Sequence, residues 1–215
     1  MKNEGIVKEL LRQGMLRLPA VKDAFMTIDR ADFLPEAARS EARKNIPVSV
    51  GDEQIASQPY TIAFMLELLE PKAGEKILEI GTGTGWQAGL LARIVGNGAS
   101  ESAGRGKVIA LELLESLAER ATKNLETYHF ISEETVEVIK SDAIRGAESE
   151  APFDKIIASV ASSKIPSAWK EQVRIGGRIV APVGENIVVL DKTGPNAFTR
   201  RQYFGFDFTP IAENK

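Results

Sequence analysis

A glycine-rich turn in the first half of the chain has residue types that could bind a charged ligand. It reads Glu79-Ile80-Gly81-Thr82-Gly83-Thr84-Gly85 and follows a short apolar run. Glycine permits positive φ and lets the backbone approach a ligand closely. The alternative interpretation is a strand-to-helix turn set by packing alone, because a glycine motif by itself is a weak signal.

The spacing of this motif argues against a dinucleotide. The dinucleotide fingerprint is Gly-x-Gly-x-x-Gly, and Trp86 stands where its third glycine would be. Glu79 also places negative charge where a pyrophosphate would be repelled. A cofactor with a sulfonium and an amino-acid ammonium fits better. The residues expected to bind it here are Glu79, Gly81, Thr82, Gly83 and Gly85.

Two further acidic residues follow apolar runs in the same way. Glu112 ends one such run, where a carboxylate can accept both hydroxyls of a ribose. Asp142 and Ala143 follow the next run, where an adenine could be held. The alternatives are an exposed loop charge for Glu112 and a turn-starting role for Asp142. Across residues 58–190 the set resembles the class I methyltransferase fold, which implies S-adenosylmethionine as the cofactor.

Helices and strands must alternate to position these residues. The patterns predict strands at 76–80, 107–112, 136–140, 153–159 and 177–183, with candidates at 186–191 and 201–209. They predict helices at 60–70, 86–95, 115–125 and 165–173. The fold class is therefore α/β, a doubly wound, mostly parallel seven-stranded sheet with antiparallel C-terminal strands. Ligands of such sheets bind at the carboxyl ends of the strands, where all the acidic candidates fall.

The first part of the chain has a different pattern. Helical spacing predicts a helix at 4–16 and a second near 21–28, and no strong strand is evident before residue 75. Residues 1–58 are interpreted as a helical and loop extension that contributes to the substrate site. Residues 59–215 are interpreted as the cofactor-binding methyltransferase domain. Residues 96–107 are expected to form a flexible Gly/Ser loop.

The segment after the fourth predicted strand indicates which chemical group accepts the methyl. Methyltransferases that act on amide or base nitrogens commonly carry an Asn/Asp-Pro-Pro-Tyr type motif there, and residues 158–163 lack it. A carboxylate is already ionised at pH 7 and needs no base. Methyl transfer then mainly requires positioning of the nucleophile. The sequence is compatible with O-methylation of a carboxyl group.

Five further segments are spread over most of the chain, from residue 29 to residue 211. They are Asp29-Arg30-Ala31-Asp32-Phe33-Leu34-Pro35, Gln54-Ile55-Ala56-Ser57-Gln58-Pro59-Tyr60, Ala151-Pro152-Phe153-Asp154-Lys155-Ile156-Ile157, Gly176-Gly177-Arg178-Ile179-Val180-Ala181-Pro182-Val183-Gly184 and Phe206-Asp207-Phe208-Thr209-Pro210-Ile211. In residue types and in order, these segments resemble motifs of the protein-L-isoaspartate O-methyltransferase family.

The resemblance implies a repair enzyme that methylates the α-carboxyl of L-isoaspartyl residues in damaged proteins or peptides. The ester then collapses to a succinimide. By the same resemblance Ser57 is the active-site serine, whose hydroxyl can donate to the substrate carboxylate. The alternative for Ser57 is an ordinary loop serine. The neighbouring residues implied to bind the substrate are Ile55, Ala56, Gln58 and Pro59.

Three positions depart from the family pattern. Ile55 stands where Thr is common, Leu113 follows the ribose-binding acid where Arg or His is usual, and Ala143 replaces a glycine. These changes put the substrate and the rate in doubt more than cofactor binding. Two alternatives therefore stay open: a class I methyltransferase with another acceptor, such as tRNA or a small molecule, and an inactive protein that binds S-adenosylmethionine.

Composition narrows the class of protein. The 215 residues carry a net charge of −3, no cysteine and one histidine, so a cysteine or multi-histidine metal site is excluded and no metal is expected. Nucleic acid and membrane are not expected as partners, since neither a basic face nor a spanning run is evident. A cytoplasmic monomer is the expectation. Most aromatic residues, including Phe204, are expected in the core, whereas Trp86 is a candidate for the cofactor pocket.

Overall fold

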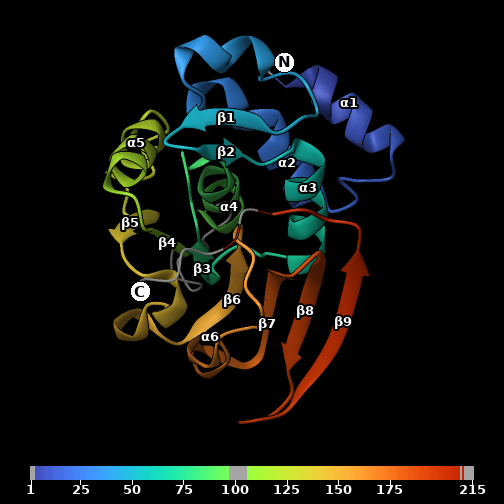
Figure 1. Ribbon diagram of the computed structural model, residues 1–215, viewed down its shortest axis with the longest axis vertical. Coiled ribbons are helices and arrows are strands. Elements are labelled where there is room, and N and C mark those ends of the chain that lie inside the picture. Colours follow the sequence, from blue (N-terminus) through green and yellow to red (C-terminus); the bar gives the residue numbers. More distant parts are fainter. Residues whose placement is uncertain (1–2, 97–105, 209, 211–215) are drawn as a thin grey trace.

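The chain forms a sheet covered by helices, with a helical segment and a small hairpin at the carboxyl ends of its strands (Figure 1). The computed structural model describes residues 3–96, 106–208 and 210. The expected loop at 96–107 therefore lies mostly outside the described residues. No helix in the described part of the chain has the length and apolarity needed to cross a membrane.

The predicted seven-stranded sheet is confirmed, with strand order β5-β4-β3-β6-β7-β8-β9. The five strands from β5 to β7 are parallel, and β8 and β9 are antiparallel. The strands are β3 (Lys76–Ile80), β4 (Lys107–Glu112), β5 (Val136–Lys140), β6 (Phe153–Ala158), β7 (Val173–Val183), β8 (Asn186–Lys192) and β9 (Phe198–Phe204). Strand order reverses between β3 and β6, which is where ligands bind in open α/β sheets.

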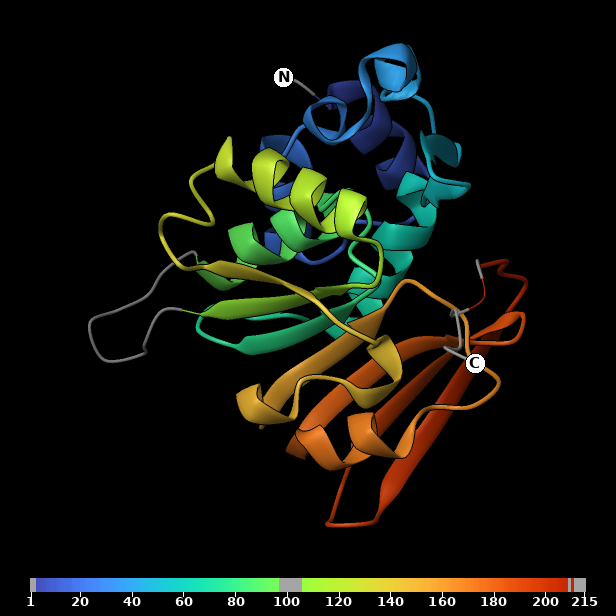
Figure 2. The ribbon, with the colours of Figure 1, turned by 60° about the vertical axis from the view of Figure 1, so that its left-hand side comes forward.

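Alternate residues of the central strands face two separate cores. Ile77, Val108 and Val180 pack on one face against helices, whereas Leu78 and Ile109 pack on the other. Figure 2 shows α4 and α5 with the N-terminal helices on one side and α6 on the other. The helices are α1 (Glu4–Arg12), α2 (Pro19–Thr27), α3 (Pro59–Leu69), α4 (Trp86–Gly96), α5 (Glu115–Glu126) and α6 (Ser167–Gln172). Short 3-10 helices are η1 (Arg30–Phe33), η2 (Glu36–Glu41), η3 (Ala143–Arg145) and η4 (Glu148–Glu150).

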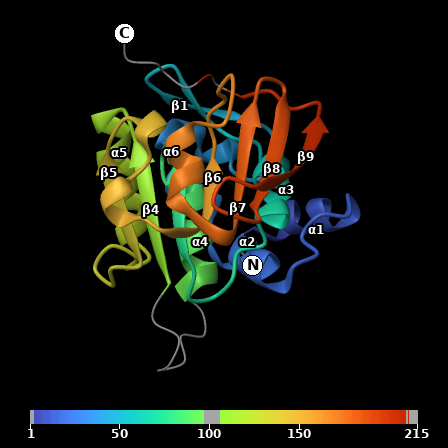
Figure 3. The same cartoon turned by 90° about the horizontal axis from the view of Figure 1, so that it is seen from below.

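The structure has two short strands before residue 75, where the sequence shows no strong strand. A two-stranded hairpin forms from β1 (Val48–Gly51) and β2 (Gln54–Ala56). Its strands are too short to give a clear alternating pattern in the sequence. Its turn also needs positive φ at Asp52 (52°) and Glu53 (57°), residues that favour this conformation far less than glycine. Figure 3 shows β1 at the same end of the sheet as the arrowhead of β9, which runs antiparallel to β8.

Several element boundaries also differ from those predicted. Helix α1 ends at Arg12 rather than at 16, because Gly14 has a φ of 75° and Leu16 a φ of 58°. Helix α6 stops at Gln172, where β7 begins directly. Strand β9 is Phe198–Phe204 rather than 201–209, because it pairs along the whole of β8 from Lys192 to Asn186. Phe204 is 72% exposed, so its placement in the core was wrong.

Candidate active site

The glycine turn joins β3 to α4 at the point where strand order reverses. Gly81, Gly83 and Gly85 all have positive φ, at 77°, 59° and 93°. A Cβ on Gly81 would lie 2.9 Å from a methyl of Val160, and one on Gly85 would lie 3.3 Å from Ala121. A Cβ on Gly83 would meet no described atom within 4 Å. Packing therefore requires the outer two glycines, while Gly83 leaves open space beside the backbone.

Glu79 lies under this turn and is completely buried. Its Oε2 accepts a hydrogen bond from the hydroxyl of Thr82 at 2.7 Å. Its Oε1 and both side-chain amide atoms of Gln87 are buried without a hydrogen-bond partner among the described residues. Burial raises the pKa of Glu79 to about 7, and the neighbouring Thr82 hydroxyl and Gln87 side chain oppose that rise. Buried polar atoms are normally hydrogen-bonded, so these are suited to a polar ligand.

Gln87 was missed by the sequence analysis, although it lines the pocket described below. The signal was a polar side chain in the first turn of a helix whose next residues are apolar, Ala88 to Leu91. Trp86, at the start of the same helix, lies at the pocket as expected and is 4% exposed. Gln87 and Trp86 both reach the pocket because α4 begins directly after Gly85, which places its first turn beside the glycine turn.

Glu112 ends β4 beside the glycine turn and is 7% exposed, so it is not an exposed loop charge. Its Oε2 accepts from the backbone N–H of Gly83 at 2.8 Å. Its Oε1 accepts from the N–H groups of Leu113 and Leu114 at 2.9 and 3.1 Å. Three backbone donors therefore hold the carboxylate at the edge of the pocket.

Asp142 and Ala143 follow β5 on the same edge of the sheet. The Asp142 carboxylate accepts from the N–H of Ile144 at 3.1 Å and caps η3. This is the turn-starting arrangement that the sequence left as an alternative. Ala143 is among the residues that line the pocket, and its carbonyl accepts from Trp169 at 2.8 Å.

A pocket lies between the ends of β3 and β4 and the β1–β2 hairpin. Thr82, Gly83 and Glu112 form one side of it, and Ile55, Ala56 and Ser57 form the other. The remaining lining residues are Val50, Gln54, Ile62, Gly81, Thr84, Trp86, Gln87, Leu111, Leu113, Leu114, Leu117, Ala143, Ser159, Val160 and Pro210. The structure thus brings together segments separated by more than 80 residues.

A second pocket lies on the other side of Ser57, which lines both. Its far wall is the segment after β9, where Phe206 and Phe208 lie near each other with ring centroids 6.4 Å apart. Phe206 also stacks on Phe64 of α3 at 5.0 Å. The lining residues are Pro47, Ile55, Ser57, Gln58, Tyr60, Thr61, Ser159, Phe204, Gly205, Phe206, Asp207 and Phe208.

The C-terminal wall of this pocket was not expected from the sequence, and neither was Ser159, which lines both pockets. Gln58 lines the second pocket, and its side chain donates to the carbonyl of Asn45 at 2.8 Å. Pro59 is buried at the first position of α3 and starts that helix, away from the lining of both pockets. Within the described residues, no group of three or more His, Asp or Glu side chains could hold a metal ion.

Solved structures share this arrangement. A chain titled protein-L-isoaspartate O-methyltransferase matches with a TM-score of 0.84 and 25% identity over 99% of this chain. This chain spans 66% of its length. A structure from Plasmodium falciparum in complex with S-adenosyl-L-homocysteine matches over 100% of both chains, with a TM-score of 0.87 and 18% identity. The fold is that of a class I, Rossmann-like methyltransferase.

Sequence comparison identifies the family. Residues 1–215 match the family described as protein-L-isoaspartate(D-aspartate) O-methyltransferase. A protein-L-isoaspartate O-methyltransferase of Staphylothermus marinus is 38% identical over 96% of this chain and 92% of its own. Protein-L-isoaspartate O-methyltransferase 2 of Archaeoglobus fulgidus is 35% identical over 94% and 90%. This chain belongs to the protein-L-isoaspartate O-methyltransferase family, a family of S-adenosylmethionine-dependent enzymes.

Proposed function

We propose that this protein transfers a methyl group from S-adenosylmethionine to the free α-carboxyl of L-isoaspartyl residues in damaged proteins or peptides. The resulting ester closes to a succinimide, which starts the repair. The observation that carries the proposal is the position of Ser57 between two pockets. One pocket has the glycine turn and acidic strand ends of a cofactor site, and the other is open to a peptide.

The cofactor supplies an electrophilic methyl group on a sulfonium. Gly83 provides a backbone surface without a side chain, and the free Oε1 of Glu79 with the Gln87 amide offers partners for an ammonium. A carboxylate has about four acceptor directions, and three backbone donors already use three of those on Glu112. One direction therefore remains for a ribose hydroxyl. Ala143 contributes backbone at the end where the adenine would lie.

On the acceptor side, the Ser57 hydroxyl donates a hydrogen bond to one oxygen of the substrate carboxylate. The other oxygen then faces the first pocket for in-line attack. The carboxylate is ionised at neutral pH, so the reaction needs orientation rather than a base. Ile55 and the aromatic segment after β9 supply apolar surface for the peptide on either side of the isoaspartyl residue.

The two parts of the chain are proposed to have different roles in the site. We propose that residues 1–58 act as an extension that completes the substrate site and that residues 59–215 bind the cofactor. Support comes from the β1–β2 hairpin, whose Ile55 and Ala56 face the glycine turn across the pocket. In this arrangement Ala56 covers the cofactor and Gln58 borders the peptide.

The test is methyl transfer from labelled S-adenosylmethionine to paired peptides that differ only in L-isoaspartate or L-aspartate. We expect labelling of the isoaspartyl peptide alone. Ser57→Ala should lower kcat/KM about 10- to 100-fold, since a hydrogen bond to a charged group contributes roughly 1.5–3 kcal/mol.

Ser162→Ala is the matched control, because the exposed hydroxyl of Ser162 bonds the carbonyl of Lys164 and lies outside the lining of both pockets. It should leave the rate unchanged. If neither peptide is labelled while S-adenosylhomocysteine still binds in calorimetry, the proposal fails. The acceptor is then another molecule, or the chain binds the cofactor without turnover.

A further inference from the structure

Arg30 is a fully buried cation in the N-terminal segment, and the function proposed above does not use it. Its guanidinium donates to three backbone carbonyls, those of Lys44, Ile46 and Ser57, at 3.0, 3.0 and 3.1 Å. Arg30 comes from η1, whereas Ser57 lies in the two-residue gap between β2 and α3. One side chain therefore ties three points of the loop and hairpin region to a single place.

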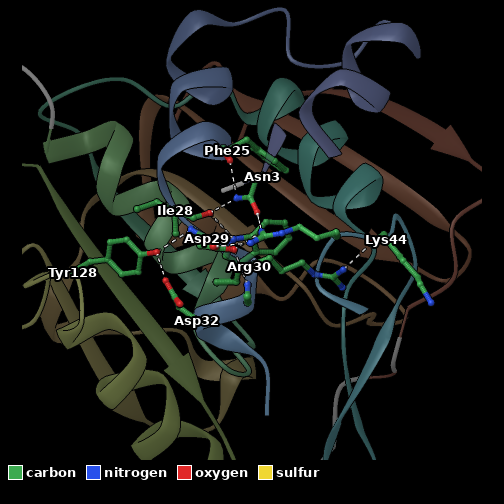
Figure 4. Close-up of polar contacts among 11 residues, drawn as sticks. Asn3, Phe25, Ile28, Asp29, Arg30, Asp32, Lys44 and Tyr128 are labelled. Atoms are coloured by element: carbon green, nitrogen blue, oxygen red, sulfur yellow. Dashed lines mark hydrogen bonds and ion pairs between the residues drawn. The ribbon is translucent and has the colours of Figure 1, made fainter. Parts of the chain in front are cut away.

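A dense polar network fixes the backbone from which Arg30 extends. Asn3 donates to the carbonyl of Ile28 at 2.7 Å, and Arg43 forms a bidentate pair with Asp29 at 2.5 and 2.9 Å. The N–H of Asp29 donates to the hydroxyl of Tyr128 at 2.9 Å. Figure 4 shows these contacts around the start of η1, with the Arg30 side chain reaching away toward Lys44.

Arg30 also contacts the cofactor side of the site. Its guanidinium lies over the ring of Trp86 at 5.4 Å from the centroid. Trp86 begins α4 and lines the first pocket, whereas Ser57 lines both pockets. The guanidinium therefore bridges the wall of the cofactor pocket and the serine that faces the substrate. A planar guanidinium has a rigid fork of donors, which a lysine ammonium lacks.

The energetic cost of this arrangement supports a role beyond folding. Burial lowers the pKa of Arg30 to about 10, so the group remains a cation at neutral pH in an interior position. Its Nε has no hydrogen-bond partner among the described residues. A buried charge held by carbonyls is a poor way to gain stability compared with an apolar side chain of similar volume.

We propose that Arg30 is a positioning residue for methyl transfer, because its guanidinium fixes the backbone of Ser57 relative to Trp86. This inference rests on the function proposed above. Arg30 acts through Ser57. It holds the serine hydroxyl at the boundary of the two pockets, where the methyl group of the cofactor meets the substrate carboxylate. The cofactor itself binds to other residues, so its affinity does not depend on Arg30.

The experiment compares Arg30→Lys, Ser57→Ala and the double variant in kinetics with the isoaspartyl peptide. Arg30→Lys should lower kcat about 10- to 100-fold and by no more than Ser57→Ala does, because a displacement of about 1 Å of a catalytic group can cost about 100-fold. Its KM for the peptide and its Kd for S-adenosylhomocysteine should stay unchanged. The double variant should be no slower than Ser57→Ala alone, since residues that act through one another are not additive.

Arg178→Lys is the matched control. Arg178 also joins several elements, through the Leu68 carbonyl and Asp191, but it lies outside the lining of both pockets. It should leave kcat unchanged. A double variant whose rate falls by the product of the two single losses would overturn the proposal, as would a full kcat in Arg30→Lys. If Arg30→Lys does not fold, Arg30→Gln replaces it in the same kinetic comparison, because this variant removes the buried charge.

Amide hydrogen exchange separates this proposal from the proposed function. Arg30→Lys should speed exchange in residues 54–62, and Arg178→Lys should not. Unchanged protection in that segment would overturn the positioning role even in an active enzyme. Conversely, if wild-type protein labels no isoaspartyl peptide, the proposed function fails, while faster exchange in Arg30→Lys still shows that Arg30 holds Ser57.

Discussion

The carboxylate of Glu112 accepts a hydrogen bond from the backbone N–H of Gly83, with 2.8 Å between Oε2 and N. The two residues lie at the carboxyl ends of neighbouring strands. Glu112 is the last residue of β4, and Gly83 lies in the turn that follows β3. The contact holds the one glycine of the turn that faces open space, and it orients the acid that would bind ribose. The hydrogen bond therefore fixes the glycine turn and the Glu112 carboxylate relative to each other.

Replacing this acid should weaken cofactor binding. In Glu112→Gln, the amide NH₂ cannot accept from backbone donors, so either Gly83 or the Leu113 and Leu114 pair loses its partner. We expect the Kd for S-adenosylhomocysteine to rise about 10- to 100-fold, measured by calorimetry. Glu137→Gln on β5, which removes an exposed pair with Lys107, should leave that Kd unchanged. Equal Kd values for wild type and Glu112→Gln would contradict the role.

Glu79 should make the stability of the free protein depend on pH. Its pKa rises from 4.5 to about 7 on folding, because burial disfavours the charged form. The folded state then binds more protons than the unfolded state between these values, so the free energy of unfolding falls as pH rises through this window. The total loss is about 3 kcal/mol and is complete above pH 7.

Glu79→Gln should therefore match wild type near pH 4 and be more stable by about 3 kcal/mol at pH 8, in urea unfolding without cofactor. The same variant should bind S-adenosylhomocysteine more weakly, because it lacks the charge that would face the ammonium. Glu53→Gln, in the exposed hairpin turn, should change stability little at either pH. If the difference in unfolding free energy between Glu79→Gln and wild type were the same at both pH values, Glu79 would not be the source of the pH dependence.

Adding a methyl group at Gly83 should separate folding from binding. Gly83 and Gly14 both have positive φ, and a Cβ on either meets no described atom within 4 Å. Each Ala variant should lose about 1–2 kcal/mol of unfolding free energy from left-handed strain. Only Gly83→Ala places the methyl at the pocket lining, so only it should raise the Kd for S-adenosylhomocysteine. Similar affinities in the two variants would show that Gly83 does not approach the cofactor.

The succession of strands and helices along the chain and the location of the glycine turn could be predicted, because both depend on patterns between neighbouring residues. The run Lys76–Ile80 followed by glycines and a largely apolar helix can be recognised whatever the tertiary context. The β1–β2 hairpin was missed because its short strands gain stability from packing rather than from alternation. Phe204 was misplaced for a similar reason, since an aromatic residue at the end of an edge strand can face outward.

The sequence by itself determined the class of fold and the acidic residues at the strand ends, since each is encoded by local spacing, whereas the serine loop was indicated by its resemblance to the family. Tertiary structure decided which of them meet. The hairpin lies opposite the glycine turn, the segment after β9 closes the second pocket, and Arg30 reaches Ser57 across 27 residues. These contacts depend on how distant segments pack, and the period of a helix or strand carries no information about the partner that covers it.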